Sequence, residues 1–528
     1  MRAMDLTPHT TQHWNVRKPA GRGEKGIVAS QSRDAAEAGV AILRAGGTAA
    51  DAAVAAAFAL ATVEPWNSGL GGIGFTQVMK PGGPAETFDF GPVAPRGLDA
   101  SAYPLTGKMK NDLFSWPEVV GDINIHGPKS ALIPSAVAGY KLLHERHGRM
   151  PIGDVLAPAV ALAKRGLSQD WFATLKIANS ASVLRLYEES ARIYLPGGLP
   201  PVPPYQGASG YFPQGRLADT LERLQSAGLA DFYTGDIAAS IAADMKAMEG
   251  FVTAEDLAAC EARVLPAMEA TFRGRRLVLA NGLTAAPTLK RLLAMMEKAP
   301  YGAMPDAAWY AYLARSLRAS YAERLAGLGE GVPTEAEPVG ADSCTTHLTV
   351  ADRDGMMISM TTTLLSSMGS RMVLPGTGVL MNNGVMWFDP QPGSPNAIAP
   401  GKRPLCNMCP VIALDAKGNP EIALGASGGR KIMASVFQQY SYVADFAMEP
   451  EAAAHHPRLD VSGPEGVMAD KRLGEATLSA LAADAEVEVV EHTVAPGNFA
   501  CPNLILQRGG MRVGVSDVMS PWSAAIAE

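Results

Sequence analysis

The sequence predicts a fold of the α/β (α+β) class in which helices enclose two antiparallel sheets. Three observations predict it. Residues 27–80 follow the order strand, helix, helix, strand, and residues 130–330 mostly repeat apolar side chains at spacings of three and four. After residue 344 the spacing changes to two. Helices outside and two sheets inside would form a layered sandwich.

The first region contains two short helices rich in alanine. Asp34 and Glu37 have the spacing of a capping box, and Gly46 is a natural stop for the helix that follows them. Thr48 and Asp51 repeat the capping-box spacing before the second helix. Because alanine lets backbones approach closely, we expect these two helices to pack tightly.

The middle of the chain is predicted to be mostly helical. Apolar residues recur at helical spacing in segments 135–148, 152–166, 217–228, 237–248 and 307–325. Residues 326–344 then lose this periodicity and gather Gly, Pro and Glu, which is typical of an exposed connector. We therefore expect a helical layer that ends at a boundary before residue 345.

The region after the connector is predicted to open with a hairpin. Residues 345–350 alternate with the period of a strand, residues 352–355 form a turn, and residues 356–364 return as a second strand. Further strands are expected within 410–429 and 503–517, with helical stretches between them.

Composition and charge exclude several classes of function. The 528 residues are 47% hydrophobic and 18% charged, which predicts a large core and excludes a disordered chain. The net charge of −7, with scattered basic residues, predicts no nucleic-acid partner. The longest apolar run, residues 52–63, is too short to span a membrane. Residues 1–26 lack the apolar stretch of an export signal, so a cytoplasmic location is expected.

The cysteines and glycines indicate neither a metal nor a cofactor. Five dispersed cysteines fit reduced thiols better than a disulfide framework; they are Cys260, Cys344, Cys406, Cys409 and Cys501. One pair among them has CxxC spacing, but no second pair and no flanking histidine accompany it. The segment GLGGIG has the spacing of a dinucleotide-binding loop, yet it follows a helix and precedes a strand, the reverse of the required order.

Thr345 stands where the connector ends and the strand begins. A threonine hydroxyl becomes an effective nucleophile when its own α-amine serves as the base, which requires that the residue be the first of its chain. Attack of the hydroxyl on the carbonyl of Cys344 would give an ester, and hydrolysis of that ester would release Thr345 as a new N-terminus. Taken alone, two threonines at a strand start also fit simple β-propensity.

Two further segments have both a chemical and a plain structural interpretation. Gly428 and Gly429 follow a predicted strand, so their backbone N–H groups can turn toward a developing oxyanion; the alternative is an ordinary glycine-rich turn. The segment NNG at residues 382–384 is either part of the site or a hairpin turn.

Five motifs, in order along nearly the whole chain, resemble the γ-glutamyltransferase family of N-terminal-nucleophile hydrolases. They are ILRAGGTAADAAVAAAFALATVEPWNSGLGGIGF, TTHLTVADRDG, GTGVLMNNG, GKRPLCNMCPVI and GASGGRKI. The resemblance implies a four-layer αββα sandwich. It also implies a proenzyme in which residues 1–344 become the large fragment and residues 345–528 the small fragment, interleaved as one domain.

Carried over by position, the resemblance makes Thr345 both the processing residue and the nucleophile. Thr363 in the returning strand would hydrogen-bond Thr345 and support both steps. Gly428 and Gly429 would supply the oxyanion-hole amides, and Asn383 would belong to the substrate site.

The residues that read glutamate in this family differ here. The position of the family's arginine, which clamps the α-carboxylate, is Gly91, and the two serines that assist it are Cys406 and Asn407. The aspartate that holds the α-amine is Trp387. Loss of the arginine and of the aspartate would each remove a charge-assisted contact of ~1.5–3 kcal/mol.

The departures favour another branch of the family. The segments MNNGVMWFDP and WNVRKP resemble γ-glutamyltransferase-like proteins, a branch that includes oxamate amidohydrolase and some acylases. Trp387 would then wall the pocket. For an anionic substrate, Arg371 and Arg430 are the nearest candidate cations by sequence. His347 is expected to be structural, because an N-terminal nucleophile already carries its base.

The sequence therefore predicts a self-processing threonine amidohydrolase that cleaves a small oxamate-like or acyl amide through an acyl-enzyme. It would need no cofactor, metal, nucleic acid or membrane, and a homodimer is left open. One alternative is a γ-glutamyltransferase or glutathione hydrolase that reads glutamate with other residues. Another is an unprocessed, non-catalytic binding homologue. Cys344 as the nucleophile is a further alternative, but it is out of register with the family's threonine.

Overall fold

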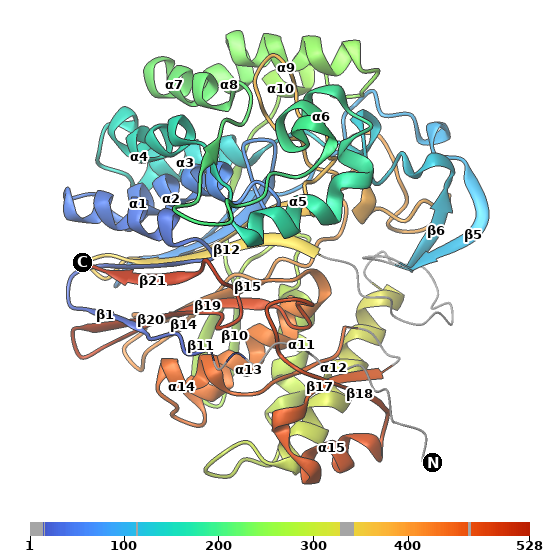
Figure 1. The fold of residues 1–528 in the computed structure, drawn as a ribbon. Helices are drawn as coiled ribbons and strands as arrows, with labels where there is room; N and C mark the ends of the chain where they lie inside the picture. The colour runs from blue at the N-terminus through green and yellow to red at the C-terminus, as the bar shows by residue number, and fades with distance from the viewer. Residues whose placement is uncertain (1–13, 15, 112–114, 328–342, 463–465) are drawn as a thin grey trace.

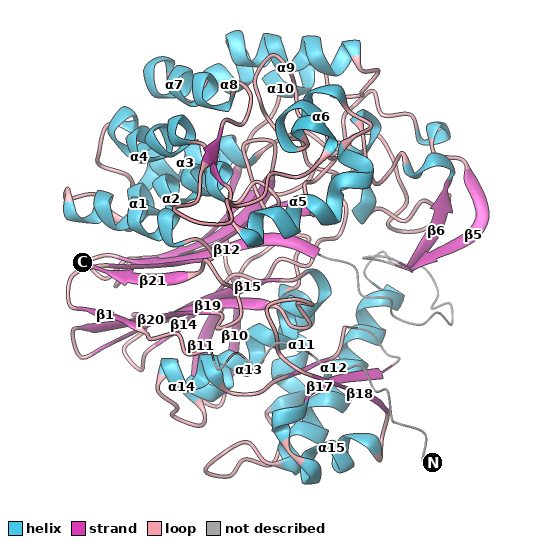
Figure 2. Ribbon diagram, in the orientation of Figure 1, coloured by secondary structure: helices cyan, strands magenta, loops and turns pink. Residues whose placement is uncertain are grey.

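Two stacked sheets lie between two layers of helices (Figure 1). A computed structural model describes residues 14, 16–111, 115–327, 343–462 and 466–528. The connector predicted at 326–344 lies almost entirely outside the described residues. The helices α1–α10 cover one sheet, and α11–α15 cover the other, as the cyan and magenta layers of Figure 2 show. The four-layer αββα prediction is confirmed.

The first sheet is antiparallel and contains the predicted hairpin at its centre. Its strands, in spatial order, are β21 (Ala524–Ala527), β2 (Ile27–Ser30), β12 (Ser343–Ala351), β13 (Met357–Ser366), β3 (Ile73–Met79), β4 (Ala85–Phe90) and β9 (Arg263–Pro266). The hairpin strands β12 and β13 therefore have a neighbour on each side, β2 and β3.

The second sheet is also antiparallel and mixes strands from both ends of the chain. Its order is β1 (Gly21–Gly23), β20 (Met511–Ser516), β19 (Cys501–Arg508), β15 (Pro420–Ser427), β14 (Val411–Leu414), β11 (Arg275–Leu279) and β10 (Met268–Phe272). Strand β15 packs face to face against β12 and β13. Apolar side chains such as Ala29, Met357 and Ile505 fill the space between the sheets.

The helical layer over the first sheet confirms the predicted helices of residues 130–250. Its members are α1 (Arg33–Arg44), α2 (Ala49–Val63), α3 (Ala136–His147), α4 (Ile152–Arg165), α5 (Trp171–Leu184), α6 (Glu188–Tyr194), α7 (Leu217–Ala227), α8 (Asp231–Thr234), α9 (Asp236–Ala247) and α10 (Ala254–Ala258). The alanine-rich α2 is buried along its whole length and packs against α1 and α4.

The helical layer over the second sheet consists of α11 (Ala286–Met296), α12 (Ala307–Gly327), α13 (Ile432–Ala444), α14 (Pro450–His455) and α15 (Glu475–Ala482). Smaller pieces complete the fold: β5 (Leu105–Asn111) with β6 (Ser115–Val119), β7 (Leu167–Ser168) with β8 (Tyr211–Phe212), and the sheet of β16 (Leu459–Asp460), β17 (Gly466–Asp470) and β18 (Glu486–Val490). The hairpin β5–β6 projects from the side of the molecule (Figure 1).

Two local predictions need correction. The capping box expected at Asp34 and Glu37 is wrong, because the helix begins two residues earlier, with Ser32 at the N-cap and Asp34 in the first turn. The equivalent prediction for the next helix is confirmed: the Thr48 hydroxyl accepts from the Asp51 N–H, and the Asp51 carboxylate accepts from the Thr48 N–H. The mostly helical region also contributes strands β9–β11, which were not predicted.

Candidate active site

Thr345 lies in a β-bulge at the start of the central strand β12. Cys344 pairs with Leu365 and Thr346 pairs with Thr362, so the register shifts between them and the single residue Thr345 lies opposite two residues of β13, Thr363 and Leu364. A bulge re-aims the side chain that it contains and is frequent beside active sites. Thr345 is only 5% exposed. The peptide bond expected to be cleaved thus lies at an irregularity in an otherwise regular hairpin.

Thr363 faces Thr345 across the hairpin. The Thr345 hydroxyl donates to Thr363 Oγ1 over 3.1 Å, the contact that the family resemblance implied, and Thr363 Oγ1 also accepts from the Leu365 N–H at 2.8 Å. Behind Thr363 runs the loop that was rejected as a dinucleotide site. A Cβ on Gly72 would lie 2.8 Å from the Thr363 carbonyl oxygen, so this loop packs as backbone against backbone.

The glycine pair lies at the end of the facing strand. Gly428 follows β15 with a φ of 137°, and Gly429, with a φ of 57°, begins the 3-10 helix η6 (Gly429–Lys431). These are values that a side chain rarely adopts. The helix η6 packs against β12, which brings the glycine pair to the strand that carries Thr345. Both glycines are half-buried.

His347 is a packing residue between the sheets. Its side chain is fully buried and hydrogen-bonds the Thr361 hydroxyl through Nδ1 at 2.9 Å. A Cβ on Gly425 would lie 2.2 Å from the imidazole, so the ring fills the space left by that glycine. Burial lowers the pKa of His347 to about 3, which keeps the ring neutral. This environment agrees with the structural interpretation of His347.

Asn383 is tied to the strand end that follows Thr363. Its side-chain oxygen accepts from the Ser366 N–H at 3.1 Å, and its side-chain nitrogen donates to the Ser366 hydroxyl at 2.7 Å. Arg371 Nη1 donates to the same hydroxyl at 2.7 Å. The segment NNG does not form a hairpin turn; Asn383 instead precedes the 3-10 helix η5 (Gly384–Trp387).

Trp387 and Cys406 belong to one buried apolar cluster that includes residues of β3 and β13. The cluster consists of Ile73, Phe75, Trp116, Ala280, Leu365, Met386, Trp387, Cys406 and Met408. Leu365 connects it to Thr363. At Gly91, where the family arginine would stand, a Cβ would lie 2.5 Å from the Phe75 ring. The place of a charged side chain is therefore filled by an aromatic one.

Arg324 is a residue of this region that the sequence analysis missed. It is 3% exposed and donates through Nη2 to the Cys406 carbonyl at 2.8 Å and to Asn407 Oδ1 at 3.2 Å. It thereby fixes the loop that carries two of the predicted substrate-binding residues. Arg430 lies next to the glycine pair and is half-buried; its carbonyl oxygen accepts a hydrogen bond from the Tyr321 hydroxyl.

A second missed group is Glu64, at the end of α2. The Thr346 hydroxyl lies 2.9 Å from Glu64 Oε2 and 2.7 Å from Gln31 Oε1. The Gln31 amide in turn donates to the hydroxyl of Ser427, the residue before Gly428. Burial raises the pKa of Glu64 to about 7. Glu64 belongs to the segment VEPWNSG of the first motif, but nothing in that segment indicated contact with the nucleophile strand.

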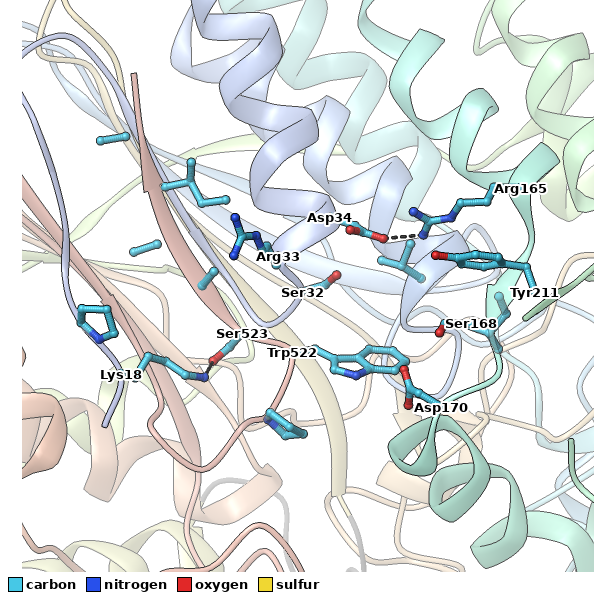
Figure 3. A pocket seen from close by; sticks show the side chains of 18 of the residues that line it. Lys18, Ser32, Arg33, Asp34, Arg165, Ser168, Asp170, Tyr211, Trp522 and Ser523 are labelled. Carbon is cyan, nitrogen blue, oxygen red and sulfur yellow. Dashed lines mark hydrogen bonds and ion pairs between the residues drawn. The ribbon is translucent and has the colours of Figure 1, made fainter. Parts of the chain in front are cut away.

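The described residues also enclose a cavity of about 720 Å³ at the edge strand β21 (Figure 3). Trp522, Tyr211 and the Asp34–Arg165 ion pair line it, and Lys18 lies at one side, bonded to Ser523. Burial lowers the pKa of Lys18 to about 8. None of the residues predicted for the site lines this cavity, so we assign it no part in the reaction.

The thiols of the CxxC pair are inert. Burial raises the pKa of Cys406 and of Cys409 to about 12, so both remain protonated. Within the described ranges, no group of three or more His, Cys, Asp or Glu side chains is placed to hold a metal ion. No helix in the described part of the chain is long and apolar enough to cross a membrane.

The two stacked sheets, their helical layers and the threonine at the head of a central strand define an N-terminal-nucleophile hydrolase fold. The cephalosporin acylase from Bacillus halodurans has this fold, with a TM-score of 0.85 and 23% identity over 99% of each chain. The family model described as Gamma-glutamyltranspeptidase matches residues 35–337 and 332–526. The chain belongs to the gamma-glutamyltranspeptidase family.

Curated relatives include two kinds of enzyme. The glutathione hydrolase proenzyme of Escherichia coli (strain K12) is 29% identical over 515 residues, covering 88% of this chain and 85% of the relative. The acylase ACY 1 proenzyme of Pseudomonas sp. (strain SE83) is 29% identical over 530 residues, covering 94% and 93%. The prediction of a γ-glutamyltransferase-like hydrolase is confirmed at the level of the family. The roles of individual site residues stay predictions.

Proposed function

We propose that this protein is a self-processing threonine amidohydrolase that hydrolyses a small amide through an ester on Thr345. The observation that carries the proposal is the position of the Thr345 hydroxyl. It lies in a bulge at the head of a central strand and donates to Thr363 at 3.1 Å, and η6 with the glycine pair packs on the same strand.

Processing would begin with attack of Thr345 Oγ1 on the carbonyl carbon of Cys344. The C–N bond breaks, the nitrogen of Thr345 takes up the hydroxyl proton, and the carbonyl carbon is left as an ester on Oγ1. The shift leaves the α-amine of Thr345 free, and water then hydrolyses the ester, which releases the Thr345 hydroxyl and a carboxylate on Cys344. The products are the large fragment, residues 1–344, and the small fragment, residues 345–528, which remain interleaved.

In the processed enzyme the free α-amine would take the proton from Oγ1 as that oxygen attacks the substrate amide. The N–H groups of Gly428 and Gly429 would stabilise the developing oxyanion, because donors fixed in advance need no reorganisation during the step. The amine of the substrate leaves with the proton. Water attacks the acyl ester, and the acid is released.

The surroundings of the site favour a small acyl group over a γ-glutamyl group. The apolar cluster around Trp387 lies next to Leu365, and Phe75 occupies the space that a side chain at Gly91 would need. Both cations named from the sequence border the predicted site: Arg371 bonds Ser366, which also binds Asn383, and Arg430 follows the glycine pair. An anionic acyl group such as that of oxamate would find its charge partner there.

The cleavage is tested by mass spectrometry and denaturing gels of the purified protein. The wild type should give two fragments that end at residue 344 and begin at residue 345, whereas Thr345→Ala should remain one chain. An active wild type that is never cleaved would overturn the mechanism.

A γ-glutamyltransferase or glutathione hydrolase is the second candidate, favoured by the likeness to the Escherichia coli glutathione hydrolase proenzyme. A panel containing a γ-glutamyl anilide, oxamate and simple acyl amides separates the two. We expect turnover of the small amides. Faster turnover of the γ-glutamyl compound would establish the second candidate.

A further inference from the structure

Four buried polar side chains form a path from the end of α2 to the glycine pair. Glu64 Oε2 and Gln31 Oε1 lie 2.9 Å and 2.7 Å from the Thr346 hydroxyl, and Gln31 Nε2 donates to the Ser427 hydroxyl. All four side chains are buried. Thr346 directly follows the proposed nucleophile, and Ser427 directly precedes Gly428, so the path touches both halves of the site.

The number of hydrogen-bond donors on this path determines whether Glu64 is protonated or ionised. A threonine hydroxyl has one proton, and in this arrangement two acceptor oxygens face it. If Thr346 donates to Gln31 Oε1, the contact with Glu64 is a hydrogen bond only when the carboxyl group supplies the proton. An ionised carboxylate at 2.9 Å would face the lone pairs of the hydroxyl and lose Thr346 as a donor, so it would rely on its hydrogen bond from the Asn67 side chain, which is costly for a buried charge.

The groups around Glu64 permit the neutral form. Lys176 of α5 is the cation that acts on it, and Cys501 of β19 is the neighbouring titratable group. Burial raises the pKa of Cys501 to about 12, so the thiol is uncharged. His347 on β12 is uncharged as well. Burial, the largest influence on the pKa of Glu64, outweighs the hydrogen bonds from Thr346 and Asn67 and the attraction of Lys176, all of which lower it.

We propose that Glu64 is a positioning residue that carries a proton in the working enzyme, and that this proton fixes the direction of hydrogen bonding from Thr346 to Ser427. The inference rests on the function proposed for Thr345. With Glu64 protonated, the carboxyl group donates to Thr346, Thr346 donates to Gln31, and Gln31 donates to Ser427. The hydroxyl proton of Ser427 then stays available at the turn of Gly428. When Glu64 ionises, Thr346 donates to Glu64 instead, and the Gln31 amide must rotate so that Ser427 donates to Gln31.

The sign of the pH effect follows. The pKa of Glu64 is raised above its ordinary value, so the neutral form is complete at low pH and is lost as the pH rises through about 7. The α-amine of Thr345 works in the opposite sense, because it must be deprotonated to act as base. The rate should therefore rise with pH and then fall, with Glu64 responsible for the alkaline limb.

The test compares the pH profiles of kcat/KM for the wild type and Glu64→Gln. A glutamine at this position donates its amide N–H to Thr346 as the protonated carboxyl does, but it cannot ionise. The wild type should lose about tenfold in rate per pH unit on the alkaline limb, and Glu64→Gln should show no such loss. An unchanged alkaline limb in Glu64→Gln would overturn the proposal.

The matched control is Asp445→Asn. Asp445 is another buried carboxyl whose pKa burial raises, to about 6, but it lies at the end of α13 on the far side of the second sheet. This variant should keep the wild-type profile. If it also loses the alkaline limb, the limb does not belong to Glu64.

Infrared spectroscopy gives a readout that does not depend on activity. Spectra of Thr345→Ala and of the double variant Thr345→Ala/Glu64→Gln are subtracted. The difference should contain the C=O stretching band of a protonated carboxyl group at pH 6, and this band should disappear by pH 8.5. A missing band at pH 6 would overturn the proton on Glu64 even if the enzyme is active. If the band titrates but the wild type has no amidase activity, the proposed function is overturned and the proton on Glu64 stays in place.

Discussion

At Thr345 the hydroxyl that is proposed to react donates a hydrogen bond to the hydroxyl of Thr363. That neighbour is itself held by the Leu365 N–H, and Leu365 has a φ of 88°, a value unusual for a residue with a side chain. Strain of this kind persists where the surroundings force it and is frequent at reactive sites. The backbone at Leu365 thus takes an unusual conformation in which its N–H supports the hydrogen-bond partner of the proposed nucleophile.

The first prediction concerns Thr363. Thr363→Ala removes the hydrogen bond to Thr345, a loss of ~1–2 kcal/mol, so kcat and the rate of self-cleavage should fall about tenfold or more. Thr363→Ser keeps the hydroxyl and should retain most of both rates. Quenched time courses on gels and steady-state kinetics measure the two effects. Equal rates for Thr363→Ala and the wild type would show that the contact has no part in either step.

His347 supports a prediction about stability. In the folded protein its pKa of about 3 lies below the ordinary value, so folding favours the neutral imidazole. The contribution of the neutral ring to stability is therefore complete above about pH 6.5. As the pH falls below that value, the unfolded chain gains a proton that the folded chain excludes. The free energy of unfolding should fall by ~1.4 kcal/mol per pH unit from this residue.

Denaturant titrations between pH 7 and pH 5 measure this slope. His347→Gln cannot titrate, so its slope should be smaller than that of the wild type by the stated amount, while contributions from other groups cancel in the difference. Identical slopes would mean that His347 is protonated in the folded protein.

At the scale of the element, the turn η6 determines whether the glycine amides face β12. Gly428→Ala would place a Cβ 2.8 Å from Ala500 at a φ of 137°, so the turn must move. Loss of one oxyanion donor typically lowers kcat about 10²–10³-fold, and we expect a loss of that order.

Gly46→Ala is the control for backbone strain. Gly46 has a φ of 94°, but nothing lies within 4 Å of its Cβ position. The variant should be less stable by about 1 kcal/mol and keep its kcat. Kinetics and unfolding curves of both variants separate the two effects. A normal kcat for Gly428→Ala would remove the glycine pair from the mechanism.

Elements with a clear period were predictable, and those fixed by distant contacts were not. Alternating side chains and a turn of Asp and Gly predict the hairpin β12–β13, and the spacing of apolar residues predicts the helices. Strands β10 and β11 are short, and charged residues surround the turn at Arg273 between them. Their membership in the second sheet depends on pairing with β14, far along the chain.

The same reason explains which site residues escaped prediction. Thr345 and Gly428 lie in motifs that have a local chemical meaning. Arg324 lies near the end of helix α12; an arginine is ordinarily exposed, and the burial of this one depends on a loop 82 residues later. Glu64 meets Thr346 across 282 residues. Neither contact leaves a pattern in the local sequence.

At the scale of the whole molecule, the proposed cleavage does not divide the structure. Strands β12 and β13 belong to the small fragment, but they lie between β2 and β3 of the large one. The second sheet likewise takes β1, β10 and β11 from the large fragment. Separation of the fragments would expose both faces of each sheet and unpair its central strands, which is equivalent to unfolding.

The last prediction follows from this arrangement. The processed fragments should elute together from a sizing column in native buffer and separate only in denaturant. The uncleaved Thr345→Ala protein should elute at the same volume and unfold in a single transition of similar midpoint. Fragments that separate without denaturant would show that the interleaved sheets do not survive cleavage.

The two sides of the structure beside Thr363 differ in how well they tolerate substitution. On one side, Gly72 and Gly74 press directly against main-chain oxygens of β13, so no larger residue can be installed there without pushing the sheet apart. On the other side, the neighbours are the side chains around Trp387, which can be trimmed or exchanged one at a time. Libraries that aim to admit bulkier acyl groups should therefore vary the tryptophan side and leave the glycine loop untouched.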